Sequence, residues 1–236
     1  MNDSFSRMFS AVVLALGIAA AGAFINQGIH YFRNFERGVE VKGLAEQVVK
    51  SDLASWNIYF SASGANLQEL YKKISQDQQQ VNAFLRNSGF KSSEIQFGTV
   101  NVTDNYANGY SSNNKLAHYQ LSGSILVSSS NIDLVASSSQ NAGELINQGI
   151  IVTSNTLSYF YNGLQQIKGK MLDEATQNAA VAAATFAKNS QSQVGKIKTA
   201  SQGVFTISSA DGALLNDTQS LYKKVRVVTS VQFFLN

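Results

Sequence analysis

The chain has 236 residues, 44% of them hydrophobic, and a formal net charge of +3 at pH 7. This length and hydrophobic content are typical of one or two globular domains and argue against intrinsic disorder. The charge excess is small and no Lys/Arg cluster occurs, which argues against nucleic-acid binding. The chain has no cysteine, so disulfide bonds, thiolate metal sites and a cysteine nucleophile are excluded. Proline is also absent, and the loops must turn with Gly, Asn, Ser and Asp.

An apolar run, Phe9–Ile25, follows a polar tail at residues 1–8. Extended to Ile29, the run reaches the roughly 20 residues that a membrane-spanning helix needs. Tyr31 and Phe32 suit the headgroup level that follows. We therefore predict a transmembrane anchor at residues 9–32, in which the lipid-facing side chains include Phe9, Val12, Val13, Leu16, Ile18, Phe24 and Ile25.

The alternative is a cleaved secretory signal, because small residues around Ala21 offer cleavage sites. Arg7 precedes the run and Arg33 and Arg37 follow it, so flanking charge does not decide the orientation. Both alternatives export the rest of the chain. We expect a single-pass protein of the bacterial inner membrane, with a linker at residues 33–38 and a periplasmic domain at residues 39–236.

Strands and helices alternate in the first half of that domain. A short strand pattern at Val39–Val41 stops near Gly43, and strict alternation from Asp52 to Ala62 predicts a half-buried strand. Apolar residues from Leu67 to Leu85 recur at helical spacing, and Gly89 suits the left-handed position after the helix. Two further strands, at 95–102 with a bulge near Gly98 and at 119–127, are expected to form a hairpin with a long polar tip.

The second half continues with a helix at 131–148, capped by Ser130 or Asn131 and ended by Gly149. A strand at 150–161 and a helix at about 170–188 follow, and then strands at 204–207 and 225–235. The buried side of the 170–188 helix is expected to consist of Met171, Leu172, Ala175, Ala179, Ala182 and Phe186. The predicted fold class is α+β, a mostly antiparallel sheet with helices on one face. It contains two strand–helix–strand–strand units, at about 51–128 and 150–235, besides the N-terminal transmembrane helix.

No pattern of catalytic or ligand residues is evident. The only histidines are His30 and His118. A metal site needs clustered ligands and a serine triad needs a histidine within reach, so we expect no metal and no cofactor. A nucleophile elbow, a P-loop and a dinucleotide fingerprint are all missing from the sequence. The carboxylates are interpreted as solvated surface, with paired acids as the alternative; they are Asp104, Asp173, Glu174, Asp211 and Asp217. We therefore predict no catalytic residue and a protein that is not an enzyme.

Aromatic residues offer a candidate subunit interface. Phe160 and Phe234 point away from the main apolar face of their predicted strands, and Tyr106 and Tyr110 lie in the polar tip. Exposed aromatic groups often mark contacts between proteins. The alternative for these residues is packing in the core or in cross-strand pairs.

Six stretches, in order along the chain, carry a family resemblance. They are VKGLAEQVVKSDLASW (41–56), FLRNSGF (84–90), VTDNYANGY (102–110), EATQNAAVAAATFAKNS (174–190), GKIKTASQGVFTI (195–207) and VRVVTSVQFFL (225–235). As a set they resemble the SIMPL-domain family, in particular its exported or membrane-anchored bacterial members. The resemblance covers almost all of 39–236, although relatives often have proline where Gly169 stands.

The resemblance implies an α+β domain that self-assembles, since some bacterial relatives form ring-like oligomers and some are linked to oxidative-stress tolerance. No catalytic residues are established for the family. We therefore expect a non-enzymatic, membrane-anchored envelope protein that forms a homo-oligomeric ring or cage, with edge strands such as 225–235 pairing between subunits. The alternatives are a monomeric or dimeric module that binds a partner protein or an apolar ligand, and a hydrolase that uses converging carboxylates.

Overall fold

The computed structural model describes residues 9, 14, 16–26, 38–107, 117–212 and 217–236. Residues 16–26 are helical, and their apolar side chains are exposed. Among the helices of these described residues, none has the length and apolar character required to cross a membrane. Of the predicted anchor residues, Phe9, Leu16, Ile18, Phe24 and Ile25 are described and largely exposed, whereas Val12 and Val13 lie outside the described residues.

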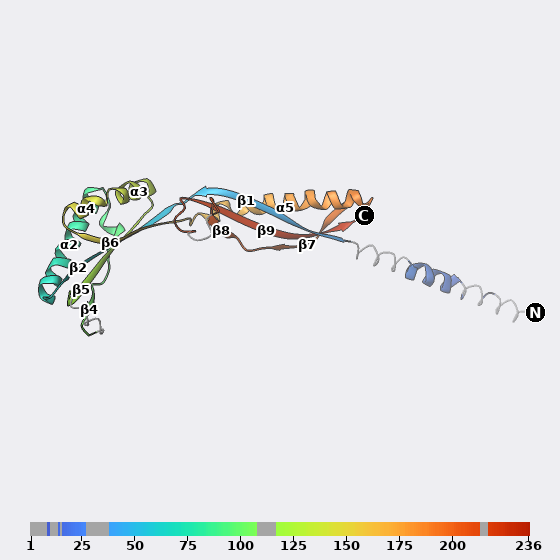
Figure 1. The fold of residues 1–236 in the computed structure, drawn as a ribbon. Coiled ribbons are helices and arrows are strands. Elements are labelled where there is room, and N and C mark those ends of the chain that lie inside the picture. Colours follow the sequence, from blue (N-terminus) through green and yellow to red (C-terminus); the bar gives the residue numbers. More distant parts are fainter. Residues whose placement is uncertain (1–8, 10–13, 15, 27–37, 108–116, 213–216) are drawn as a thin grey trace, which may run out of the picture. The chain divides into compact units, whose positions relative to one another are not determined.

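The remaining residues divide into two compact units. We call residues 47–167 and 207–225 the five-stranded unit, and residues 38–46, 168–206 and 226–236 the four-stranded unit. Most elements of both are labelled in Figure 1.

The five-stranded unit is an antiparallel sheet with helices α2 (Leu67–Asn87), α3 (Ile132–Gln140) and α4 (Gly143–Asn147). Its strand order is β3-β5-β2-β6, and β4 also pairs with β5. The strands are β2 (Leu53–Gly64), β3 (Ile95–Phe97), β4 (Asn101–Asp104), β5 (Tyr119–Ser129) and β6 (Ile151–Phe160).

Alternation along β2 creates the core of this unit. Trp56, Ile58 and Phe60 are fully buried, and Trp56 stands between Val127 of β5 and Leu157 of β6 in the ladder. Helix α2 begins at a side-chain cap, because the Asn66 Oδ1 accepts hydrogen bonds from the backbone of the first turn. The helices cover the face of the sheet to which these apolar side chains point.

The four-stranded unit has the strand order β1-β9-β7, with β8 also paired to β9. Its elements are β1 (Gly38–Lys50), α5 (Leu164–Asn189), β7 (Val194–Gln202), β8 (Thr206–Ser209) and β9 (Tyr222–Leu235). Strands β1, β8 and β9 and helix α5 each contribute residues to both units. The buried side of α5 consists of residues spaced by four, namely Met171, Ala175, Ala179, Ala183 and Ala187.

A close approach between α5 and β1 depends on Gly43. A Cβ atom built at Gly43 would lie 1.8 Å from the carbonyl oxygen of Ala175 and 2.7 Å from the backbone nitrogen of Ala179. Small residues on both elements therefore let the helix backbone pack directly on the strand.

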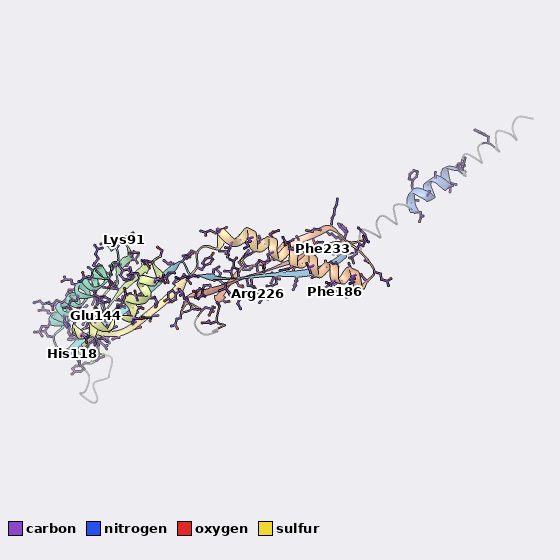
Figure 2. The ribbon with its side chains drawn as sticks, turned by 90° about the horizontal axis from the view of Figure 1, so that it is seen from above. Lys91, His118, Glu144, Phe186, Arg226 and Phe233 are labelled. Carbon is purple, nitrogen blue, oxygen red and sulfur yellow. The ribbon has the colours of Figure 1, made fainter. Side chains whose placement is uncertain are left out.

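The structure confirms an α+β fold with antiparallel pairing, but it has two sheets where one was expected. The two predicted repeat units do not separate, because β6 pairs with β2 of the first unit and not with β9. Phe186 was expected on the buried side of α5 but is 59% exposed, whereas Phe233 of β9 is buried (Figure 2). The suggestion that 225–235 is an edge strand is wrong, because β9 has partners on both sides.

Candidate functional site

Helix α4 lies between two hollows of the five-stranded unit. The helix is held in place by Leu145, which is fully buried, and by Ile150, which follows Gly149 with its positive φ of 82°. Helix α3 ends at Gln140, and Asn141 and Ala142 separate it from α4. The predicted single helix at 131–148 is therefore two short helices, and α4 offers one side to α2 and the other to β6.

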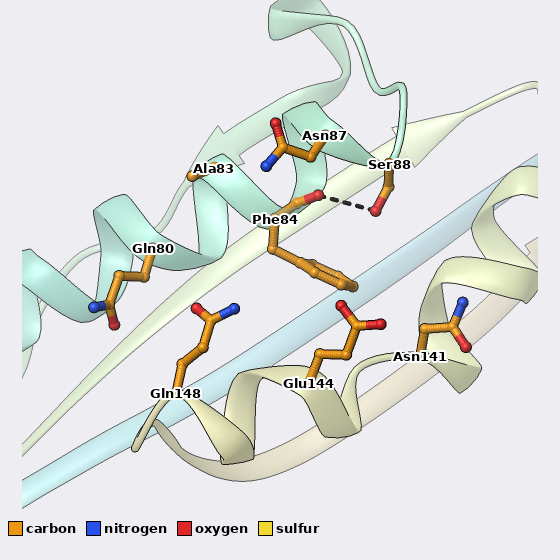
Figure 3. Close-up of a pocket in the computed structure, with 8 residues that line it drawn as sticks. All are labelled: Gln80, Ala83, Phe84, Asn87, Ser88, Asn141, Glu144 and Gln148. Carbon is orange, nitrogen blue, oxygen red and sulfur yellow. Dashed lines mark hydrogen bonds between the residues drawn. The ribbon is translucent and has the colours of Figure 1, made fainter.

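The first hollow, which we call the α2–α4 groove, has a volume of about 320 Å³ and is shown in Figure 3. Helix α2 contributes its last two turns, and the segment from Asn141 to Gln148 forms the opposite wall. The side chains of Gln148 and Glu144 extend towards α2, and the Phe84 ring lies between the two walls (Figure 3). The lining residues are Gln80, Ala83, Phe84, Asn87, Ser88, Asn141, Glu144 and Gln148.

The groove combines one buried ring with exposed polar side chains. Phe84 belongs to the core, and the Ser88 hydroxyl donates to the Phe84 carbonyl oxygen at 2.9 Å. The four carboxamides and the Glu144 carboxylate have no side-chain hydrogen bond to any described residue. Their donors and acceptors are thus free for a ligand, and Glu144 is the only charged residue of the lining.

The second hollow lies between α4 and β6 and has a volume of about 240 Å³. Ile146 of α4 lines it and is 61% exposed; Ile151, at the start of β6, is 58% exposed. A groove between helix and sheet was expected for a binding module, but this one is only partly apolar. The lining residues are Ala142, Gly143, Ile146, Val152, Thr153, Ser154 and Asn155.

Tyr106, one of the predicted interface residues, belongs to an aromatic stack at the base of the polar tip. His118 (Figure 2) lies between Tyr106, at 4.3 Å between ring centroids, and Tyr119, at 3.9 Å. The His118 Nε2 is 3.4 Å from Asp104 Oδ1, which also accepts hydrogen bonds from two backbone N–H groups. These groups, the Ala107 N–H foremost, lower the pKa of Asp104. The sequence did not predict this stack, because it depends on the strand register that pairs Asp104 with Tyr119.

The other predicted interface residues lie apart from Tyr106. Phe160 is at the end of β6, on the opposite edge of the sheet, and is 39% exposed. Phe234 belongs to β9 of the four-stranded unit, where the Lys198 Nζ lies 5.7 Å from its ring centroid. Tyr110 lies outside the described residues.

Two of the scattered carboxylates meet at the turn between β8 and β9. The Ser209 hydroxyl donates to Asp211, and the Ser209 backbone N–H donates to Asp217 Oδ1 at 3.0 Å. Lys223 is only 4% exposed and donates to the Asp217 carbonyl oxygen. Burial lowers the pKa of Lys223 despite the two nearby aspartates.

The polar groups in this turn form hydrogen bonds with one another and so fix the backbone of the turn. The described residues contain no group of three or more His, Asp or Glu that could hold a metal ion. Nothing in the turn places a free nucleophile beside a free base among these residues, so we interpret it as a structural clamp.

Comparison with known proteins places these features in a family. A search of curated proteins finds no match to the chain. The family profile that matches is SIMPL, described as a protein of unknown function (DUF541), and the match covers residues 39–232. It therefore includes both units, the α2–α4 groove and the edge strand β6. The chain belongs to the SIMPL family.

Proposed function

We propose that this protein is a non-enzymatic, membrane-anchored envelope protein whose SIMPL domain self-associates through the free edge of β6. The anchor is the apolar segment at residues 9–32, and the domain faces the periplasm. The observation that carries self-association is the composition of β6, compared with the other long edge strands.

Strand β6 is an edge strand without the charged side chains that usually oppose pairing, although its register with β2 shifts between Val152 and Ser154. It has 10 residues, IVTSNTLSYF, and none is charged or proline. Natural sheets protect exposed edges with lysine, other charges or proline. The edge strands of the other sheet follow this rule, since β1 contains Lys42 and Glu46 and β7 contains Lys196 and Lys198.

Among the described residues, most of the β6 edge has no strand partner. Near its end, the Tyr159 N–H donates to the Thr218 carbonyl oxygen at 2.6 Å, so the open stretch is 151–158. The exposed side chains of Ile151 and Ile146 flank its first residues, and Phe160 follows its last. A second copy that paired here would satisfy free backbone groups and cover apolar surface at the same time.

The test of self-association is the mass of the full chain in detergent, measured by light scattering. We expect a discrete oligomer for the unchanged protein and a smaller particle for Thr156→Lys, which places a charge on the open stretch of β6. The matched control is Gln120→Lys, because Gln120 is exposed on β5, a strand with partners on both sides. Equal masses for the two variants would exclude the β6 edge, and a monomeric unchanged protein would exclude self-association.

A second candidate function is a binding module, which the α2–α4 groove favours. Its polar lining does not fit the apolar ligand expected from the sequence. A monomer that still binds a ligand in this groove would support the module in place of the assembly.

A further inference from the structure

We propose that the α2–α4 groove binds an amino sugar that carries a free ammonium group. This proposal concerns a ligand and does not depend on self-association or on the membrane anchor. It rests on three properties of the groove: its charge, its hydrogen-bonding groups and its aromatic ring.

The charge of the groove favours a cation. Glu144 supplies the only charged side chain of the lining, and its carboxylate is turned towards the Phe84 ring (Figure 3). Residues 80–88 are the C-terminal end of the 21-residue helix α2, where the helix dipole is negative. An ammonium group between the carboxylate and the ring would gain both an ion pair and a cation–π contact.

Two cations close to the groove along the chain, Lys73 and Arg86, are already engaged. The Lys73 Nζ is paired with Asp77 Oδ1 at 2.5 Å and also lies 3.5 Å from the Gly149 carbonyl oxygen. Arg86 donates to Ser92 Oγ at 2.7 Å and to the Phe90 carbonyl oxygen. Neither lines the groove, so an anionic ligand would meet Glu144 without a compensating cation.

The neutral lining favours hydroxyl groups. Each of the carboxamides of Gln80, Asn87, Asn141 and Gln148 offers both N–H donors and a carbonyl acceptor, which suits sugar hydroxyls that also donate and accept. Phe84 is 8% exposed, and its exposed part offers a small apolar contact for a sugar ring. A volume of about 320 Å³ is near the lower limit of ligand sites, about 300–1,000 Å³, and suits one or two sugar rings.

The test uses calorimetric titration of the full chain in detergent with three tetrasaccharides of similar size, each able to place one or two rings in the groove, and one smaller polyamine. They are the tetramers of glucosamine, N-acetylglucosamine and glucose, and spermine as an ammonium ligand without hydroxyls. We expect the glucosamine tetramer to bind at least about tenfold more tightly than the other three. Comparable binding of the glucose tetramer would overturn the role of charge, comparable binding of spermine would overturn the role of the sugar, and no binding of any probe would overturn the proposal.

Two matched pairs of variants locate the site. Glu144→Gln is expected to weaken binding of the glucosamine tetramer about tenfold. The control is Glu69→Gln, which should leave the affinity unchanged because Glu69 is an exposed carboxylate in the first turn of α2. Gln80→Ala is expected to weaken binding, whereas Gln79→Ala, its exposed neighbour outside the groove, does not. Equal effects within either pair would place the ligand elsewhere and overturn this site.

The oligomer mass of each variant separates this proposal from self-association. A variant that loses sugar binding but keeps its mass contradicts neither proposal, and a Thr156→Lys protein that is smaller but still binds shows that the groove acts alone.

Discussion

Glu94 links the short 3₁₀ helix η1 (Ser92–Glu94) to the end of β5. Its Oε1 accepts a hydrogen bond from the Ser129 hydroxyl at 2.6 Å, and its Oε2 accepts one from the Lys91 backbone N–H at 2.8 Å. Ser129 is buried and its hydroxyl also accepts from the Asn131 N–H. The Ser129 bond, followed by the Lys91 bond, lowers the pKa of Glu94 from its ordinary 4.5.

Glu94→Gln should therefore destabilise the protein in a pH-dependent way. Because the folded pKa is lowered, the carboxylate stabilises the fold above the unfolded pKa, and this contribution is lost as pH falls through the folded pKa. At pH 7 we expect the free energy of unfolding to drop by about 1–2 kcal/mol, with the difference shrinking in acid. Urea unfolding at pH 7 and at an acid pH measures this difference in the free energy of unfolding. Glu144→Gln, whose carboxylate has no hydrogen bond to a described residue, is the control. A loss that stays constant with pH would contradict the assignment.

Asn155 accepts the hydrogen bond of the indole N–H of Trp56, the only tryptophan of the chain. Trp56 is fully buried, and its Nε1 donates to Asn155 Oδ1, while Asn155 Nδ2 donates to the Ser139 carbonyl oxygen. Asn155→Ala leaves the indole N–H unpaired, so we expect a loss of about 1–3 kcal/mol in unfolding followed by Trp56 fluorescence. Thr156→Ala, at the next exposed position, should change stability little. Similar losses in both variants would show that the strand, and not the hydrogen bond, is responsible.

At the scale of elements, the contact between α5 and β1 limits which residues fit at position 43. Gly43→Ala brings a methyl group into the backbone of α5 at Ala175, so we expect a loss of about 1–3 kcal/mol from overpacking. Gly169→Ala, within α5 and with no atom near its added methyl group, should instead gain up to about 1 kcal/mol. Thermal unfolding followed by circular dichroism compares the two. A tolerated alanine at position 43 would show that the helix can move away.

Local periodicity predicted most elements, because alternation and helical spacing are properties of neighbouring residues. The strand at 52–62 and the ends of helices at Gly89 and Gly149 are confirmed, both glycines having positive φ. The buried face of helix α5 was predicted incorrectly for a physical reason. Alanines occur on several sides of the helix, so the apolar residues do not mark one face clearly. The pattern therefore did not indicate that Ala183 is buried in place of Ala182, or that Phe186 is exposed.

Strand partners and the groove could not be predicted in the same way. That β6 pairs with β2 and that β9 is central are facts about residues far apart in the chain. The groove consists mainly of exposed amides from α2 and from the segment that follows α3, and exposed Gln and Asn have no periodic signature. One of its lining residues, Phe84, lies within the apolar stripe predicted for 67–85, but that stripe indicates only the core.

At the scale of the whole molecule, the segment before residue 38 is proposed to bind the protein to a membrane. We expect the full chain to remain in the membrane fraction until detergent is added, and a chain without residues 1–37 to be soluble and still folded. Fractionation with mass spectrometry of the N-terminus checks both. A full chain that is soluble and begins after Ala21 or Ala23 would support a cleaved signal and contradict the anchor.

Strand β9 follows every other strand of both sheets in the chain, and yet it is the strand that joins β1 to β7. During synthesis, β1 therefore has no strand partner until all the intervening elements have left the ribosome. The strands of the other sheet, all between residues 53 and 160, can pair earlier. While it waits, β1 has two unpaired edges, and its glutamates and lysines then serve a second purpose by keeping nascent chains from joining one another.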